Sequence, residues 1–144
     1  MPTTNNPDTI LAFDIGGQRT GVARAHLGAP FPGPLTTLDE PAKFLDAIVE
    51  LCTRENAAMV VLGLPRGMGG QDTEQTEQVR AFGRELEQRL PVPVYWMDEA
   101  LTSVKAEAEL RSRGKPYDKG DIDALAATLI LEDFIKEHPE LTHG

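Results

Sequence analysis

Short unbroken runs of apolar residues alternate along the chain with longer stretches in which apolar residues recur every three or four positions. The short runs are rich in aliphatic and β-branched residues, which is typical of strands buried on both faces of a sheet. The longer stretches are typical of helices that bury one side. The predicted strands span residues 9–15, 19–25, 35–38, 58–63 and 92–97, and the predicted helices span 41–55, 73–90, 101–113 and 121–137.

Glycine and proline separate these elements. Gly16 and Gly17 form a short turn after the first strand, so the first two strands should pair as a hairpin. Residues 28–34 hold three prolines and two glycines, and we expect a loop there that leads into a short edge strand at 35–38. A hairpin followed by alternating helices and strands predicts an α/β fold, in which a mixed sheet carries helices on its faces.

The chain has 144 residues, which fits a single domain. We expect this domain to span residues 9–137, with a flexible N-terminus at 1–8 and a flexible tail at 138–144. The lone Cys52 excludes an internal disulfide and fits a reducing compartment. No apolar run approaches the ~18 residues of a membrane helix, and residues 1–8 do not have the form of a secretory signal. We therefore expect a cytoplasmic protein with no membrane partner.

The formal net charge of −9 argues against a broad basic surface for nucleic acid or for an anionic membrane. It does not exclude a local basic patch. Nor does it exclude a site that uses carboxylates.

Three carboxylates lie where a site should form. Asp14 ends the first buried strand, Glu99 follows the fifth strand beside Asp98, and Asp123 lies in the first turn of the last predicted helix. In open α/β sheets, sites form outside the carboxyl ends of the strands. Asp14 and Glu99 can therefore face each other if their strands are neighbours, and the last helix can close a third side.

Grouped carboxylates repel one another and need a counter-ion to stay charged. The hard cations Mg²⁺ and Mn²⁺ prefer oxygen ligands, and one or two such ions can support hydrolysis of a phosphodiester. Each residue also has a purely structural alternative. Asp98 and Glu99 can form a capping turn, and Asp123 can simply complement a helix dipole. Asp14 is harder to explain this way, because an acid after an apolar run is costly unless it is paired or used.

Four segments resemble the RuvX/YqgF family, in the family's order and spacing: residues 13–23, 61–70, 98–102 and 123–131. The resemblance covers about residues 9–136. It implies an RNase H-like fold, with a five-stranded mixed sheet and helices on both faces. It also implies a metal-dependent nuclease, described as a Holliday junction resolvase in DNA recombination and repair and as the nuclease that matures the 5′ end of pre-16S ribosomal RNA.

The family's acidic positions fall on Asp14, Glu99 and Asp123, and its basic residue in the first loop falls on Arg19. The resemblance therefore implies that these acids are catalytic and hold one or two Mg²⁺ or Mn²⁺ ions. The chain departs from the family at three positions near the site. Gly67 and Gly69 stand where the family often has Asn and Asp, and Ala100 stands where it often has Arg. The carboxylates needed for metal chemistry are intact, whereas these loops bear on how the substrate is held.

The connection at 111–120 carries a net charge of +3, from four basic residues and one Asp. It joins the helix that follows Glu99 to the helix that holds Asp123, so we expect it to border the site. A few phosphate contacts of this kind position a strand without reading its sequence. A solvated charged loop is the alternative. The candidate nucleic-acid contacts are Arg19, Arg66, Arg111, Arg113, Lys115 and Lys119.

Three functions remain open at this point. The first is a nuclease acting on branched DNA such as four-way junctions, or on precursor rRNA; a resolvase should act as a symmetric homodimer that cuts two opposed strands. The second is a non-catalytic protein that binds nucleic acid or ribosome precursors. The third is a nucleotide phosphotransferase of the actin and sugar-kinase type, which has a similar Asp-x-Gly turn but needs two such domains.

Overall fold

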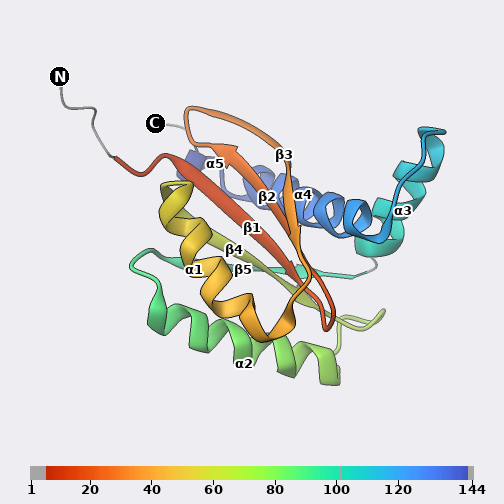
Figure 1. Cartoon of the computed structure of the whole chain (residues 1–144), viewed down its shortest axis with the longest axis horizontal. Helices are drawn as coiled ribbons and strands as arrows, with labels where there is room; N and C mark the ends of the chain where they lie inside the picture. Colours follow the sequence, from red (N-terminus) through yellow and green to blue (C-terminus); the bar gives the residue numbers. More distant parts are fainter. Residues whose placement is uncertain (1–5, 101, 143–144) are drawn as a thin grey trace.

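A five-stranded mixed sheet forms the centre of the molecule, with strand order β3-β2-β1-β4-β5 (Figure 1). The computed structural model describes residues 6–100 and 102–142. The first three strands form an antiparallel meander, and the last two run parallel to the first. The strands are β1 (Thr9–Ile15), β2 (Thr20–His26), β3 (Ala29–Leu38), β4 (Ala57–Pro65) and β5 (Val94–Glu99).

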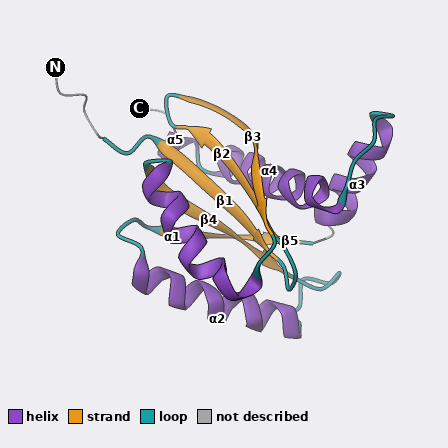
Figure 2. Cartoon of the chain, viewed as in Figure 1, coloured by secondary structure: helices purple, strands orange, loops and turns teal. Residues whose placement is uncertain are grey.

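Helices cover both faces of the sheet (Figure 2). One face carries α1 and α2, and α4 crosses the other face with α3 packed against it. The mixed five-stranded sheet with helices on both faces that the sequence predicts is therefore confirmed. The helices are α1 (Phe44–Arg54), preceded by a 3-10 turn at Pro41–Lys43, α2 (Glu74–Arg89), α3 (Thr102–Ser112), α4 (Lys119–Glu137) and α5 (Pro139–Thr142).

The side-chain alternation of β1 divides the core into two layers. Leu11 and Phe13 pack toward α1 and α2, whereas Ile10 and Ala12 pack toward α4. Each large apolar side chain that is fully buried in this way contributes roughly 1.5–3 kcal/mol. The same alternation places Asp14 on the α4 face of the sheet.

The expected loop at 28–34 is wrong, because β3 begins at Ala29 and runs for ten residues. The physical reason is its place in the sheet. β3 is an edge strand that pairs with β2 alone in the described sheet. An edge strand tolerates Pro30, Pro32 and Pro34, because an N–H that points away from the sheet makes no ladder hydrogen bond and can be absent. Two irregularities in the β2–β3 register accommodate this segment.

The last helix begins earlier than the sequence predicts. Asp118 caps it through a capping box with Asp121, and Lys119 is its first residue. Asp123 therefore lies in the second turn rather than the first.

The described residues near the chain ends contact the rest of the domain. Residues 139–142 form α5, and the centroid of the His138 ring lies 4.5 Å from that of Phe134. Near the N-terminus, the Asp8 N–H donates to the Asn56 carbonyl oxygen. The flexible ends expected at 1–5 and 143–144 lie outside the described residues. In the part of the chain that the structure covers, no helix is long and apolar enough to cross a membrane.

Candidate active site

A pocket of about 180 Å³ opens where β1, β4 and β5 end. Asp14 and Glu99 both line it, as the sequence predicts. Their strands are not neighbours, however, because β4 lies between them. The two carboxylates line the same pocket because both lie at positions of their strands that face α4. The remaining lining residues are Gly63, Pro65, Arg66, Gln75, Thr102, Ser103, Val104 and Ile130.

Gly63 of β4 separates the two carboxylate-bearing strands in this pocket. A Cβ at this position would lie 2.5 Å from Cδ1 of Ile130 on α4. The missing side chain therefore lets α4 approach the sheet closely.

Asp14 is held in surroundings that oppose its charge. Burial raises the pKa of Asp14 to about 6, and the negative charge of Asp123 adds to this effect. Near neutral pH, a nearby positive charge would therefore stabilise the ionised carboxylate strongly.

Glu99 is in a similar position at the end of β5. Burial raises the pKa of Glu99 to about 7. The negative charge of Asp133 contributes to this rise in the pKa, whereas a hydrogen bond from Thr102 opposes it. Thr102 Oγ1 donates to Glu99 Oε2 at 2.8 Å, while Glu99 Oε1 is buried and accepts no hydrogen bond from the described residues. A bound cation would give this oxygen a partner, as would a hydrogen bond to Asp133 when one of the two carboxyl groups is protonated.

Asp123 reaches the site from α4, where its carboxylate pairs with the guanidinium of Arg19. The backbones of β2 and α4 are in close contact here, since a Cβ on Gly21 would overlap the Asp123 carbonyl. The packing of these two elements thus brings Arg19 and Asp123 together. The charge of Asp123 still reaches Asp14, so the three predicted acids share one region.

Within the described residues, no three His, Cys, Asp or Glu side chains are grouped closely enough to hold a metal ion. Asp14 and Glu99 nevertheless suit a hard cation. Both offer oxygen donors, burial disfavours the charge of both, and Glu99 Oε1 has no partner. Asp123 can join them if its carboxylate turns from Arg19 to the ion, or through Oδ1, since the contact with Arg19 is made by Oδ2.

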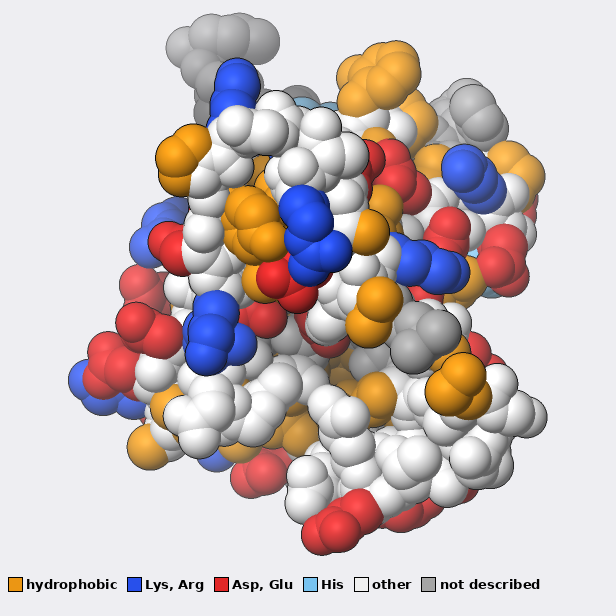
Figure 3. All heavy atoms as spheres, turned by 90° about the vertical axis from the view of Figure 1, so that its right-hand side faces the viewer, with side chains coloured by type: hydrophobic (Ala, Val, Ile, Leu, Met, Phe, Trp, Pro, Cys, Tyr) orange, Lys and Arg blue, Asp and Glu red, His pale blue; other side chains and the backbone are white. Residues whose placement is uncertain are grey.

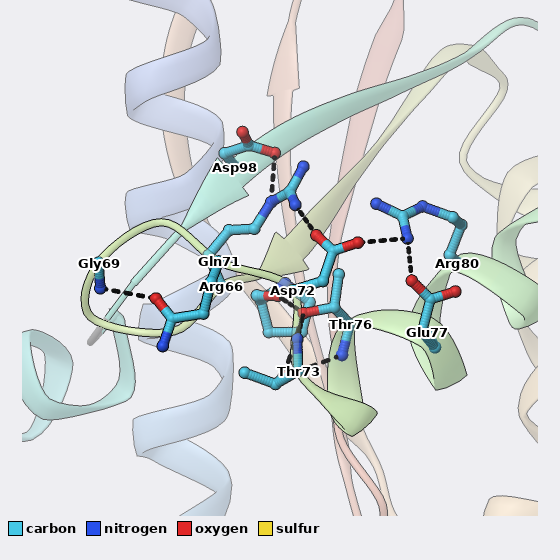
Figure 4. Close-up of polar contacts among 10 residues, drawn as sticks. Arg66, Gly69, Gln71, Asp72, Thr73, Thr76, Glu77, Arg80 and Asp98 are labelled. Atoms are coloured by element: carbon cyan, nitrogen blue, oxygen red, sulfur yellow. Dashed lines mark hydrogen bonds and ion pairs between the residues drawn. The ribbon is translucent and has the colours of Figure 1, made fainter.

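Arg66 lines the same pocket, and its guanidinium is held between two carboxylates (Figure 4). It pairs with Asp72 and, at 3.3 Å, with Asp98. Asp72 also contacts Arg80 at 3.2 Å, and Arg80 pairs with Glu77. The hydrogen bond and positive charge of Arg80, together with the charge of Arg66, lower the pKa of Asp72. This network ties the loop after β4 to β5 and α2.

Contrary to the prediction, the basic connection at 111–119 does not border the Asp14–Glu99 pocket. Arg113 and Lys115 line a different cavity of about 280 Å³, beside Tyr117 and Pro34. The reason is the direction of α3, which stands away from the sheet and carries this connection to its far end (Figure 1). Arg111 pairs with Glu107 at 3.8 Å and Arg113 with Glu109 at 3.0 Å, while Lys119 is exposed at the start of α4.

No continuous basic surface is visible on the side of the molecule where the strands end. Figure 3 shows this side, with blue side chains in separate groups and red side chains between them. A phosphate backbone would therefore meet a few separate cations rather than a broad positive field.

Sequence reasoning missed two residues of the site. Thr102 is absent from the predicted site, although it lies three residues after Glu99 and donates a hydrogen bond to its carboxylate. Asp133 was not considered. It lies on α4 ten residues after Asp123, about 80° around the helix, so helical spacing from Asp123 did not indicate it.

Comparison with known proteins finds relatives that match over most of the chain. The family model described as "RuvX: Holliday junction resolvase" matches residues 8–137. A protein of Thiobacillus denitrificans named "Putative pre-16S rRNA nuclease" is 42% identical over 138 residues, covering 93% of this chain and 95% of the relative. One of the same name from Chloroflexus aurantiacus is 39% identical, covering 96% of this chain and 95% of the relative.

Two solved structures of Thermus thermophilus RuvC are similar in fold. RuvC in complex with a Holliday junction substrate gives a TM-score of 0.56 at 19% identity, covering 94% of this chain and 98% of RuvC. A second RuvC structure gives a TM-score of 0.55 at 18% identity, covering 91% of this chain and 96% of RuvC. These likenesses show that the chain has the RNase H-like fold.

Proposed function

The chain belongs to the RuvX family, and from that premise we propose that it is a hydrolase that cuts phosphodiester bonds of structured nucleic acid with Mg²⁺ or Mn²⁺. One observation carries the proposal. Two carboxylates from different strands, Asp14 and Glu99, share one pocket, burial disfavours the charge of both, and one oxygen of Glu99 has no partner in the described structure. A divalent cation relieves this arrangement more directly than a neutral ligand would.

In this proposal Asp14, Glu99 and Asp123 hold one or two ions. When bound, such an ion activates water and neutralises charge on the phosphate. Thr102 keeps Glu99 oriented through its 2.8 Å hydrogen bond. Asp123 exchanges Arg19 for the ion, which leaves the Arg19 guanidinium available to a phosphate oxygen.

Arg66 is the second proposed phosphate contact at this pocket. The carboxylates of Asp72 and Asp98 hold its side chain in place. An arginine that is already oriented loses less conformational entropy when it binds a phosphate.

The proposed substrates are those indicated by the names of the relatives, four-way DNA junctions and the precursor of 16S rRNA. A four-way junction is resolved by two opposed cuts, which require two active sites. For that substrate we propose a homodimer with two-fold symmetry.

The deciding experiment is a side-by-side cleavage assay with a four-way DNA junction and an RNA fragment spanning the 5′ end of pre-16S rRNA. Each is incubated with Mg²⁺, with Mn²⁺ or with chelator. We expect metal-dependent products from at least one substrate. Asp14→Asn should lower the rate by more than about a hundredfold, whereas Asp39→Asn, at an exposed position, should not change it.

Full activity of Asp14→Asn, or equal products in chelator, would rule out the proposed site. Binding of both substrates without any product would favour the non-catalytic alternative.

A further inference from the structure

A second cavity, of about 170 Å³, adjoins the carboxylate pocket. Gln75, in the first turn of α2, lines both of them. The second cavity lies between the β1–β2 turn and the starts of α1 and α2. Its lining residues are Ile15, Gly16, Gly17, Pro41, Phe44, Gln75, Gln78, Val79 and Phe82.

The chemistry of this second cavity differs from that of the carboxylate pocket. None of its lining residues is charged, two are aromatic and two carry side-chain amides. Such a lining suits an uncharged flat ring with polar edges and does not suit a phosphate. The size is also appropriate, since an apolar protein cavity of roughly 150 Å³ can hold a benzene ring.

We propose that this cavity receives a nucleobase, displaced from its stack, of the strand whose phosphate lies at Asp14 and Glu99. The proposal rests on the nuclease function proposed above. Phe44 and Phe82 supply aromatic and apolar surface for the base, and the amides of Gln75 and Gln78 can hydrogen-bond to its edge.

The geometry of β1 explains how one strand could reach both sites. Asp14 and Ile15 are consecutive residues, so their side chains point to opposite faces of the sheet. A nucleic-acid strand that passes over the end of β1 can therefore place a phosphate on one side and a base on the other. The edge of the cavity is open at Gly17, because this residue has no side chain and a Cβ there would meet no atom within 4 Å.

A protein side chain is a less suitable occupant. The adjoining pocket is the proposed site of a phosphodiester, so a nucleotide of the same strand is already nearby. Displacing a base costs a few kcal/mol and costs least where the base is unpaired. The cavity would thus favour nucleotides at junctions or single-stranded ends over regular duplex.

The test uses two matched variants. Gly17→Phe places a ring at the rim of the cavity, and Gly28→Phe adds the same ring at the opposite end of β2. Neither glycine has a positive φ, and a Cβ at either would meet no atom within 4 Å. Both variants should therefore fold, which circular dichroism checks. Phe82→Leu is a third variant that removes one aromatic ring but keeps an apolar side chain.

The probes are a fluorescent four-way DNA junction and a fluorescent pre-16S RNA fragment, each made intact and with one abasic nucleotide at successive positions. Affinity is measured by anisotropy in chelator. For the DNA or the RNA probe, we expect one abasic position to weaken binding of the wild type and of Gly28→Phe by about tenfold. Gly17→Phe should bind the intact probe about tenfold more weakly and be insensitive to that abasic position. Phe82→Leu should show a smaller loss in the same pattern.

Three results would overturn the proposal: no abasic position that stands out, a Gly17→Phe defect that is equal on intact and abasic probes, or no binding of either probe. An equal defect would mean that the added ring obstructs the backbone rather than a base. Failure of the nuclease proposal is recognised separately, because it appears as absence of metal-dependent cleavage by the wild type.

Discussion

Asp14 follows four fully buried residues of β1, and this position governs its ionisation. Burial raises the pKa of Asp14 in the folded protein to about 6, above the ordinary value of 3.8. The folded state therefore binds the proton more tightly than the unfolded state does. When folding raises the pKa of a carboxylate, the free energy of unfolding falls as the pH rises from the unfolded pKa to the folded pKa. Above the folded pKa, the whole destabilisation from the buried charge is present.

The first prediction is that Asp14→Asn stabilises the metal-free protein at about pH 8. The variant removes a buried charge, so the free energy of unfolding should increase by roughly 2–3 kcal/mol. The gain should shrink toward zero near pH 4, where the folded wild type is already protonated. Urea denaturation in chelator at both pH values measures this, with Asp39→Asn as the control. An equal gain at both pH values would mean that charge is not the cause.

Arg19 has two potential partners, the carboxylate of Asp123 and a substrate phosphate. Because the pair is formed in the structure, a cation and Arg19 compete for Asp123. Cation binding and phosphate binding should therefore support each other.

The second prediction is that Arg19→Ala binds Mn²⁺ about fivefold more tightly, because the competing cation is removed. Isothermal titration calorimetry measures this directly. The same variant should bind nucleic acid more weakly. Arg24→Ala is the matched control, since Arg24 lies on β2, the strand that begins directly after Arg19, and pairs with Glu55 at 2.5 Å. Unchanged Mn²⁺ affinity in Arg19→Ala would show that Arg19 does not compete with the ion for Asp123.

At the scale of elements, the contact between β2 and α4 decides where Asp123 lies. Gly21 is paired with Asp14 across the β1–β2 ladder, and its Cα faces the carbonyl of Asp123. One glycine thus allows three parts of the site, from β1, β2 and α4, to approach one another.

The third prediction concerns Gly21→Ala. The added methyl group overlaps backbone rather than a flexible side chain, so α4 must shift. We expect a loss of about 1–3 kcal/mol of stability, measured by urea denaturation, together with weaker Mn²⁺ binding. Gly17→Ala meets no atom within 4 Å and should change both quantities little. A stable Gly21→Ala protein with normal Mn²⁺ affinity would contradict this account of the site.

At the scale of the whole molecule, the net charge of −9 combines with extensive pairing of the basic residues. Besides the proposed phosphate contacts, Arg80, Arg89 and Arg113 all contact carboxylates. Few cations are therefore available to neutralise phosphates, and any ions bound at the site would supply part of the positive charge.

The fourth prediction is a weak salt dependence of nucleic-acid binding. Two or three phosphate contacts lower the affinity only about ten- to fortyfold between about 50 and about 200 mM NaCl, whereas six to ten contacts lower it by roughly 10³–10⁵. Anisotropy with the four-way junction over this range measures the slope. A thousandfold loss would mean that a much larger basic surface forms in the complex.

Patterns that are local in sequence were sufficient for most of the fold. The apolar runs located β1, β4 and β5, and helical spacing located α1 and α2, because each element buries one face or both at a fixed period. The same reasoning failed for residues 29–34. Proline content alone cannot distinguish a loop from an edge strand, which depends on whether a neighbouring strand lies on one side or on both.

The sequence by itself determined that Asp14 lies at the carboxyl end of a buried strand, since an acid after four apolar residues is costly wherever the strand lies. It also brought Glu99 and Asp123 into consideration through their positions at element ends. Only the tertiary structure decided which charges meet. The pairing of Arg19 with Asp123, the proximity of Asp133 to Glu99 and the placement of 111–119 away from the pocket depend on how α3 and α4 pack. Such packing angles arise from contacts between distant segments, and no local periodicity encodes them.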